Sequence, residues 1–176
     1  MKKSIVASLM IIVILSAMLA GCGSKNDVTL TIPKDYMGET TQEELDQAVR
    51  ENGYRSATLN DDGSVTYVIT KAQHEEMLSG VRASIDRSLA EMTESSSYPN
   101  ITNIAANDDY TVFTITTKNE KPDMAESFAV IGLYMYGAMY GVFSGKSPDN
   151  IHIDFVNEAT GEVTASSDSK DMGNSD

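Results

Sequence analysis

The chain has little of what disulfide-bonded and catalytic sites are commonly built from. Its 176 residues include one cysteine, two histidines and no tryptophan. A single thiol excludes an internal disulfide and a thiolate zinc site. Leu78 stands where an H-E-x-x-H motif starting at His74 would need its second histidine. The sequence also lacks a phosphate-binding loop, a dinucleotide fingerprint and a G-x-S-x-G turn, so it predicts no metal, no cofactor and no enzymatic activity.

Positively charged residues are also few. Thirteen lysines and arginines stand against 26 aspartates and glutamates, which gives a formal net charge of −13. Such a surface repels the phosphates of nucleic acids, so we predict no nucleic-acid partner. It also repels anionic lipid headgroups, so basic side chains cannot supply a membrane attachment. An acidic surface does keep a secreted protein soluble.

The chain does have an N-terminal leader. Two lysines at positions 2 and 3 precede an apolar run over residues 5–20, and the small residue Gly21 precedes Cys22. A positive segment, an apolar segment and a small residue form a secretory signal. The tetrad Leu-Ala-Gly-Cys at its end resembles the lipobox of bacterial lipoproteins. This resemblance implies cleavage between Gly21 and Cys22 and a diacylglycerol, with acyl chains such as palmitate, on Cys22.

An uncleaved transmembrane helix is the alternative interpretation of this leader. Residues 4–21 make 18 residues, the short end of a bilayer span. No cluster of basic residues follows the run. We therefore expect a signal peptide over residues 1–21 and a lipidated cysteine with a short tether over residues 22–27. Five tether residues reach at most about 18 Å, so the domain would lie close to the outer face of the cell membrane.

Alternation and periodicity of apolar residues predict one α+β domain over residues 28–165. The predicted order is β-α-β-β-α-β-β-α-β-β, with helices on one face of a two-layer, largely antiparallel sheet. The first six elements match a ferredoxin-like unit, which an added strand-helix-hairpin would extend. The last strand is predicted near residues 162–165. Residues 166–176 contain one apolar residue, and we expect them to form a disordered tail.

Three capping boxes and an internal echo support this order. Threonines at positions 41, 70 and 117 are each followed three residues later by Glu or Gln, a pattern typical of helix starts. Residues 60–71 and 107–118 share six identities in twelve, which indicates two hairpins with the same turn. The apolar positions after the two turns are offset by one residue, and such an offset flips the faces of a strand. The echo therefore requires a bulge, or it is a coincidence.

One predicted helix, over residues 122–143, is apolar on every side. No charged residue occurs from position 127 to 145, and such a helix is buried on more than one side. Gly137, Gly141 and Gly145 recur every four residues and would let another backbone approach closely. Three interpretations stay open: a central helix packed on the sheet, a helix with one side exposed to a partner or ligand, and a second membrane span. In the second of these, the contact surface would consist of Tyr134, Tyr136, Met139 and Tyr140.

Two groups of polar residues could carry chemistry, but simpler explanations fit both. His152 and Asp154 lie two apart in a predicted strand, opposite its apolar residues, and we expect them to face solvent. The aspartate pairs at 61–62 and 108–109 lack the spacing of an EF-hand. Turn chemistry explains them, so no metal site is predicted there.

The body of the chain also resembles a known group. Similarity to small uncharacterised lipoproteins of Gram-positive gut bacteria is carried by the segments TIPKDYMGETTQEELDQAV, YVITKAQHEEM, MYGAMYGVFSGK and NIHIDFVN. This resemblance implies a place in the cell envelope and no site residues. We expect a lipid-anchored, extracytoplasmic protein with a non-enzymatic binding or structural role. The alternatives are a module that captures a small molecule or peptide for a membrane system, and an envelope hydrolase with paired carboxylates.

Overall fold

The computed structural model describes residues 27–172 and confirms the α+β class. The predicted leader, the cleavage site and Cys22 lie outside the described residues, as do residues 173–176. The elements in chain order are β1 (Asp27–Ile32), α1 (Lys34–Met37), α2 (Gln42–Asn52), β2 (Ser56–Leu59), β3 (Val65–Thr70), α3 (Lys71–Glu94), β4 (Ile101–Ala106), β5 (Val112–Thr117), α4 (Met124–Ser144), β6 (His152–Asn157), β7 (Val163–Asp168) and the 3₁₀ helix η1 (Ser169–Asp171).

The strands form two sheets instead of one. β1, β3 and β2 form an antiparallel sheet in that order, and β4, β5, β6 and β7 form a second sheet in that order. In the second sheet β5 and β6 run parallel, joined by α4, while the outer pairs are antiparallel. In the ferredoxin-like unit expected from the sequence, the fourth strand would belong to the same sheet as the first three. In the structure this strand, β4, pairs with β5 in the second sheet instead, which corrects this detail.

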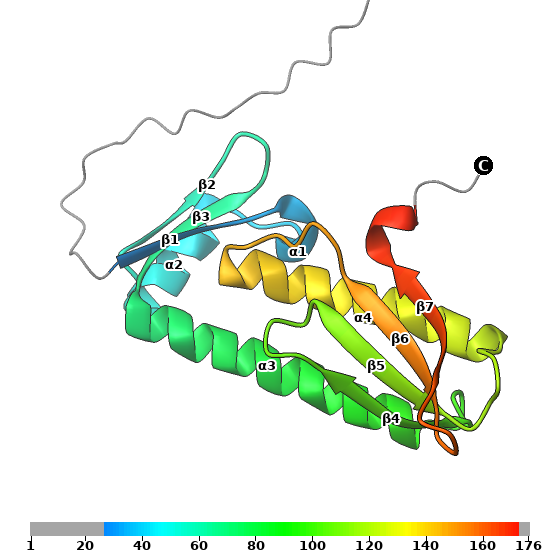
Figure 1. Ribbon diagram of the computed structural model, residues 1–176. Helices are drawn as coiled ribbons and strands as arrows, with labels where there is room; N and C mark the ends of the chain where they lie inside the picture. Colours follow the sequence, from blue (N-terminus) through cyan, green and yellow to red (C-terminus); the bar gives the residue numbers. More distant parts are fainter. Residues whose placement is uncertain (1–26, 173–176) are drawn as a thin grey trace, which may run out of the picture.

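The length of α3 explains the division. Its 24 residues span about 36 Å at 1.5 Å per residue. A strand of six residues, such as β3, spans only about 20 Å. The helix therefore carries the chain beyond the first sheet before β4 begins. Figure 1 shows α3 running along the molecule beside both sheets, and it contacts β1, β3 and β4.

Each sheet has its own apolar core. The core of the first sheet includes Leu30, Val65 and Ile69, which are covered by Leu45 of α2. The core of the second sheet is larger, and its fully buried members are Ile85, Phe113, Ile115, Leu133 and Ile153. Both long helices connect the cores, because Met77 of α3 and Val142 of α4 pack against the first one.

The internal echo corresponds to two hairpins with the same turn chemistry. In each turn the asparagine side chain, of Asn60 or Asn107, donates a hydrogen bond to the hydroxyl four residues later. The fourth turn residue has a positive φ in both, 82° at Gly63 and 55° at Tyr110. Such a φ favours glycine, so Tyr110 holds a backbone conformation that non-glycine residues rarely adopt.

The offset between the hairpins is an extra residue in the second loop. The backbone N–H of Asn60 donates to the carbonyl of Ser64, whereas that of Asn107 donates to the carbonyl of Val112, one position further along. As a result Val65 is buried in the first hairpin, while Val112 is exposed and Phe113 takes the buried place in the second. Of the two explanations left open for the offset, an inserted residue and coincidence, the extra loop residue supports the insertion.

The start of α4 differs from the prediction. The capping boxes at Thr41 and Thr70 are present, but Thr117 ends β5 and is fully buried. Its hydroxyl donates to the buried carboxylate of Glu126. The actual box is formed by Asp123 and Glu126, so α4 begins at Met124. The threonine pattern at residues 117–120 was misleading because a strand end also places a polar residue before a loop.

The predicted tail from residue 166 is partly ordered. β7 extends to Asp168, and η1 follows at once. Polar contacts hold this segment: Ser167 accepts a hydrogen bond from the Tyr134 hydroxyl (2.7 Å), and Ser166 donates to Asp154 (2.6 Å). Hydropathy did not reveal the strand because small polar side chains hold it to the sheet.

Candidate functional site

The structure buries two of the four predicted contact residues and leaves the other two partly buried. Tyr134 and Tyr140 are buried, with 6% and 4% of their surface exposed. Tyr136 and Met139 are partly buried and pack against the core of the second sheet. Burial of Tyr134 and Tyr140 contradicts an open contact surface made of all four residues, although Tyr134 still lines one side of a groove beside α4.

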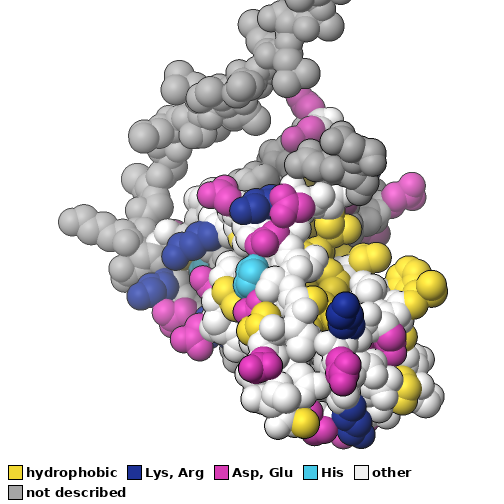
Figure 2. All heavy atoms as spheres, turned by 45° about the vertical axis from the view of Figure 1, so that its right-hand side comes forward, with side chains coloured by type: hydrophobic (Ala, Val, Ile, Leu, Met, Phe, Trp, Pro, Cys, Tyr) yellow, Lys and Arg dark blue, Asp and Glu magenta, His cyan; other side chains and the backbone are white. Residues whose placement is uncertain are grey.

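The opposite side of α4 is exposed and apolar. Met124, Phe128, Ile131 and Met135 are 77%, 62%, 44% and 66% exposed. They recur at spacings of four, three and four residues, and Ala138 and Val142, which are partly buried, continue the series. We call the six residues Met124, Phe128, Ile131, Met135, Ala138 and Val142 the α4 stripe. Figure 2 shows hydrophobic side chains gathered along one margin of the domain.

A groove runs beside the second half of the α4 stripe. It has a volume of about 430 Å³, and its lining includes four residues of the stripe, Ile131, Met135, Ala138 and Val142. Tyr134 of α4, Tyr36 of α1 and Met172 after η1 also line it. Tyr36 and Met172 are themselves 42% and 56% exposed. The stripe thus has two halves: side chains that protrude near the start of α4, and a groove near its end.

The α4 stripe carries no charge in a strongly acidic protein. The one charged residue of α4 is Glu126, which is 1% exposed. Its carboxylate accepts hydrogen bonds from the Asn119 side chain (3.1 Å) and from the backbone N–H of Asp123 (2.8 Å). It also accepts the hydrogen bond from the Thr117 hydroxyl. A contiguous exposed apolar surface typically marks an interaction site.

α4 is also the one helix among the described residues that is long and apolar enough to cross a membrane. Eight of its residues are nevertheless buried, including Leu133, Gly137 and Gly141. A methyl group added at Gly137 would lie 2.5 Å from the carbonyl oxygen of Tyr110. These contacts describe a helix packed on the second sheet along one face and exposed along the other.

A second candidate is the polar cluster around Arg82, between α3, the β4–β5 turn and α4. The Arg82 guanidinium donates to the Tyr140 hydroxyl (3.0 Å from Nε), and the Tyr110 hydroxyl donates to Asp86 (2.7 Å). The two tyrosine rings lie 4.9 Å apart. Burial, followed by the bond to Asp86, raises the pKa of Tyr110. The hydrogen bond to Tyr140 is the main cause of the raised pKa of Arg82.

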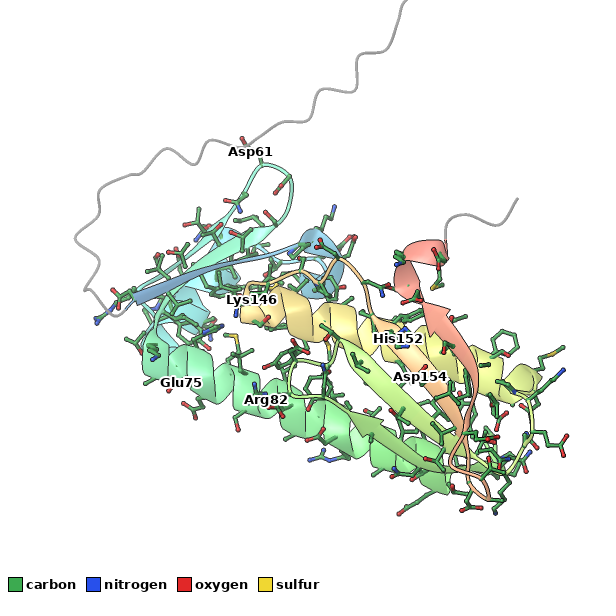
Figure 3. All side chains as sticks on the ribbon, viewed as in Figure 1. Asp61, Glu75, Arg82, Lys146, His152 and Asp154 are labelled. Atoms are coloured by element: carbon green, nitrogen blue, oxygen red, sulfur yellow. The ribbon has the colours of Figure 1, made fainter. Side chains whose placement is uncertain are left out.

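Two cavities of about 500 and 660 Å³ meet at Arg82. Their charged lining mixes Arg82 and Lys146 with four aspartates, at positions 86, 108, 109 and 149. Figure 3 shows Arg82 on α3 with Lys146 just beyond α4. The polar groups of Arg82, Tyr110 and Asp86 already bond to the protein itself. We interpret this cluster as a structural link between α3, the hairpin and α4.

A third candidate is His152, which lies between two carboxylates. Its Nε2 is 3.0 Å from Asp154 and its Nδ1 is 3.0 Å from Asp168. The bond to Asp168 is the main cause of the raised pKa of His152. Asn150, followed by His152, lowers the pKa of Asp168. Both ring nitrogens of His152 are engaged by carboxylates, and the Ser166 hydroxyl donates to Asp154 and not to the imidazole.

The side assigned to His152 and Asp154 is confirmed, since both are about one-third exposed while Ile153 and Phe155 are buried. Sequence reasoning missed Asp168, because it assigned that residue to a disordered tail. The turn aspartates accept hydrogen bonds inside their own turns: Asp62 from Ser64 and Asp109 from Thr111. Among residues 27–172, no group of three or more His, Cys, Asp or Glu side chains is arranged so that it could hold a metal ion.

The exposed residues of α4 were also missed. Their helical spacing is the one signal of them in the sequence, and it does not distinguish them from the buried side of α4, which has the same spacing at Val130, Leu133 and Gly137. Comparison of the chain with protein-family models, curated proteins and solved structures finds no match. The α4 stripe is therefore the site from which a function can be argued.

Proposed function

We propose that this protein is a lipid-anchored, extracytoplasmic lipoprotein that binds a protein partner at the cell envelope and catalyses no reaction. The observation that carries the proposal is the α4 stripe, an uncharged apolar surface on a domain of strongly negative charge. The lipobox-like tetrad at Cys22 supports the location. Diacylglycerol on Cys22 would supply two acyl chains, which suffice for stable anchoring where one chain gives marginal binding.

The shape of the surface favours a protein over a small ligand. Small-molecule sites enclose most of their ligand in a concave pocket. Here the groove of about 430 Å³ continues into the protruding side chains of Met124 and Phe128. An elongated apolar surface with this spacing suits a partner that presents an apolar helix of its own.

The groove also supports a second candidate, the capture of an apolar small molecule or peptide for a membrane system. Tyr134 and Met135 both line it, and Ala138 and Val142 add apolar contacts. On this alternative, the groove alone would matter, and changes at Met124 or Phe128, outside it, would leave binding intact.

A photoreactive amino acid at position 135 tests the proposal in cells that make the lipidated protein. Met135 is 66% exposed in the middle of the α4 stripe, so we expect light to produce a covalent adduct with a protein. The matched control is position 75, since Glu75 is 65% exposed on α3 outside the stripe. Adducts with lipid alone, or equal adducts at both positions, would overturn the proposal.

A further inference from the structure

We propose that the partner of the α4 stripe is a second copy of this chain, packed so that the two α4 helices run antiparallel. This inference rests on the proposed function and names its partner. The stripe has the spacing of a coiled-coil seam: from Met124 to Val142 the steps are four, three, four, three and four residues. Apolar residues at such steps form the contact line between two packed helices.

The stripe is complementary to itself under a two-fold rotation. If the axis passes midway between Ile131 and Met135, Ile131 of one copy faces Met135 of the other. Phe128 then faces Ala138, and Met124 faces Val142. Each of the outer pairs places a large side chain against a smaller one, which is how facing helices interdigitate. An interface in which the same patch serves both copies is the usual form of a soluble dimer.

The exposure of the two halves agrees with this pairing. Phe128 protrudes from the first half, with 62% of its surface exposed. Ala138, its counterpart, is partly buried and lines the groove together with Tyr36 and Met172. The protruding half of one copy would therefore enter the groove of the other, and the same contact would occur twice. From Met124 to Val142 the seam is about 27 Å long.

Charge favours this face over the rest of the surface for self-association. Two copies with a formal charge of −13 each repel one another. The residues that flank the exposed half of the stripe are Ala125, Ser127 and Gly132, none of which carries charge. A methyl group built at Gly132 meets no atom within 4 Å, so the backbone is open to a neighbour there. Contact through this part of the helix buries apolar area whose immediate neighbours on α4 carry no charge.

Disulfide formation between two differently labelled full-length chains tests the pairing in native membranes. One chain carries Phe128→Cys and the other carries Ala138→Cys, and acylation of Cys22 leaves no other thiol. We expect oxidation of the mixture to give a product of twice the chain mass that contains both labels. Phe128→Cys alone should give none, because residues 128 of the two copies lie about 15 Å apart along an antiparallel seam, beyond the reach of a disulfide.

Each outcome decides the matter. A self-linked product from Phe128→Cys alone would overturn the antiparallel pairing, and the absence of any mixed product would overturn the dimer. Adding Ile131→Asp to both chains should abolish the mixed product, since it places charge at the centre of the seam. A mixture with cysteine at position 75 of both chains is the control for random collision. An adduct at position 135 with a different protein, without the mixed disulfide, would retain the proposed function and reject the second copy.

Discussion

Gly137 and Gly132 lie five residues apart in α4 and have opposite surroundings. A methyl group at Gly137 would come within 2.5 Å of the Tyr110 carbonyl oxygen and 2.8 Å of Cδ1 of Ile151. At Gly132 the same group would meet nothing within 4 Å. The sequence predicted a close backbone approach at Gly137, and the contact with Tyr110 confirms it.

Replacing each glycine with alanine should therefore have opposite effects on stability. We expect Gly137→Ala to lower the free energy of unfolding by about 1–3 kcal/mol, since a backbone atom cannot move aside easily. Gly132→Ala should raise it by about 0.5–1 kcal/mol, because alanine loses less backbone entropy in a helix. Urea unfolding followed by circular dichroism measures both. Equal effects of the two changes would contradict the packing described for α4.

Tyr110 shows what a turn pattern conveys at the level of one residue. The echo predicted its turn, and the comparison with Gly63 shows that glycine would suit the positive φ better. Tertiary contacts retain tyrosine instead: its ring packs against Tyr140, and its hydroxyl donates to Asp86. None of these partners lies within its own hairpin, so the local pattern could not indicate the choice.

At the scale of elements, a charged side-chain contact adds to the backbone pairing of β7 with β6. His152 of β6 contacts Asp168 of β7, and the raised pKa of His152 means that the protonated ring favours the folded state. This contribution is complete below the ordinary pKa of histidine and is lost as the pH rises through the raised value. The pKa of Asp168 is lowered, so its own contribution is lost only in acid.

His152→Gln should thus reduce stability more at about pH 5.5 than at about pH 8.5. The free energy of unfolding at both pH values, for the variant and the parent, gives the difference. Ser167→Ala is the matched control, because it removes the hydrogen bond from Tyr134 on the same strand without removing a titrating group. A loss for His152→Gln that does not change with pH would show that the ring is not protonated between its two carboxylates.

Element boundaries were predictable where a local signal was unambiguous. The capping boxes at Thr41 and Thr70 begin α2 and α3 as expected. The third threonine failed because Thr117 bonds to Glu126 across a loop, a partner that lies outside the motif. The extent of β7 failed for a related reason, since its side-chain partners belong to α4 and β6.

For the whole molecule, the proposed lipid anchor has a direct test. We replace residues 1–22 with a signal peptide that ends in an ordinary cleavage site and lacks a lipobox. The acidic domain should then appear in the soluble fraction without detergent, because α4 packs on its own sheet and the lipid is gone.

The parent chain, with Cys22 in place, should remain with the membrane, and mass spectrometry should find acyl chains on its N-terminal cysteine. If the chain with the replaced leader is found only in the membrane pellet, α4 or another segment holds the protein there. An unmodified leader on the parent chain would overturn the lipoprotein assignment itself.

The sequence by itself determined the class of fold, the places of the hairpin turns and two of the three capped helix starts, because these depend on neighbours a few residues away. It also indicated a helix with no charge after Glu126 and with more than one apolar side. Which side is exposed was decided only by the tertiary structure. α4 has apolar residues at helical spacing on both sides, and the crossover from β5 to β6, with Gly137 against Tyr110, selects the one that is buried. The division into two sheets likewise follows from where a 24-residue helix delivers the chain, which no local pattern specifies.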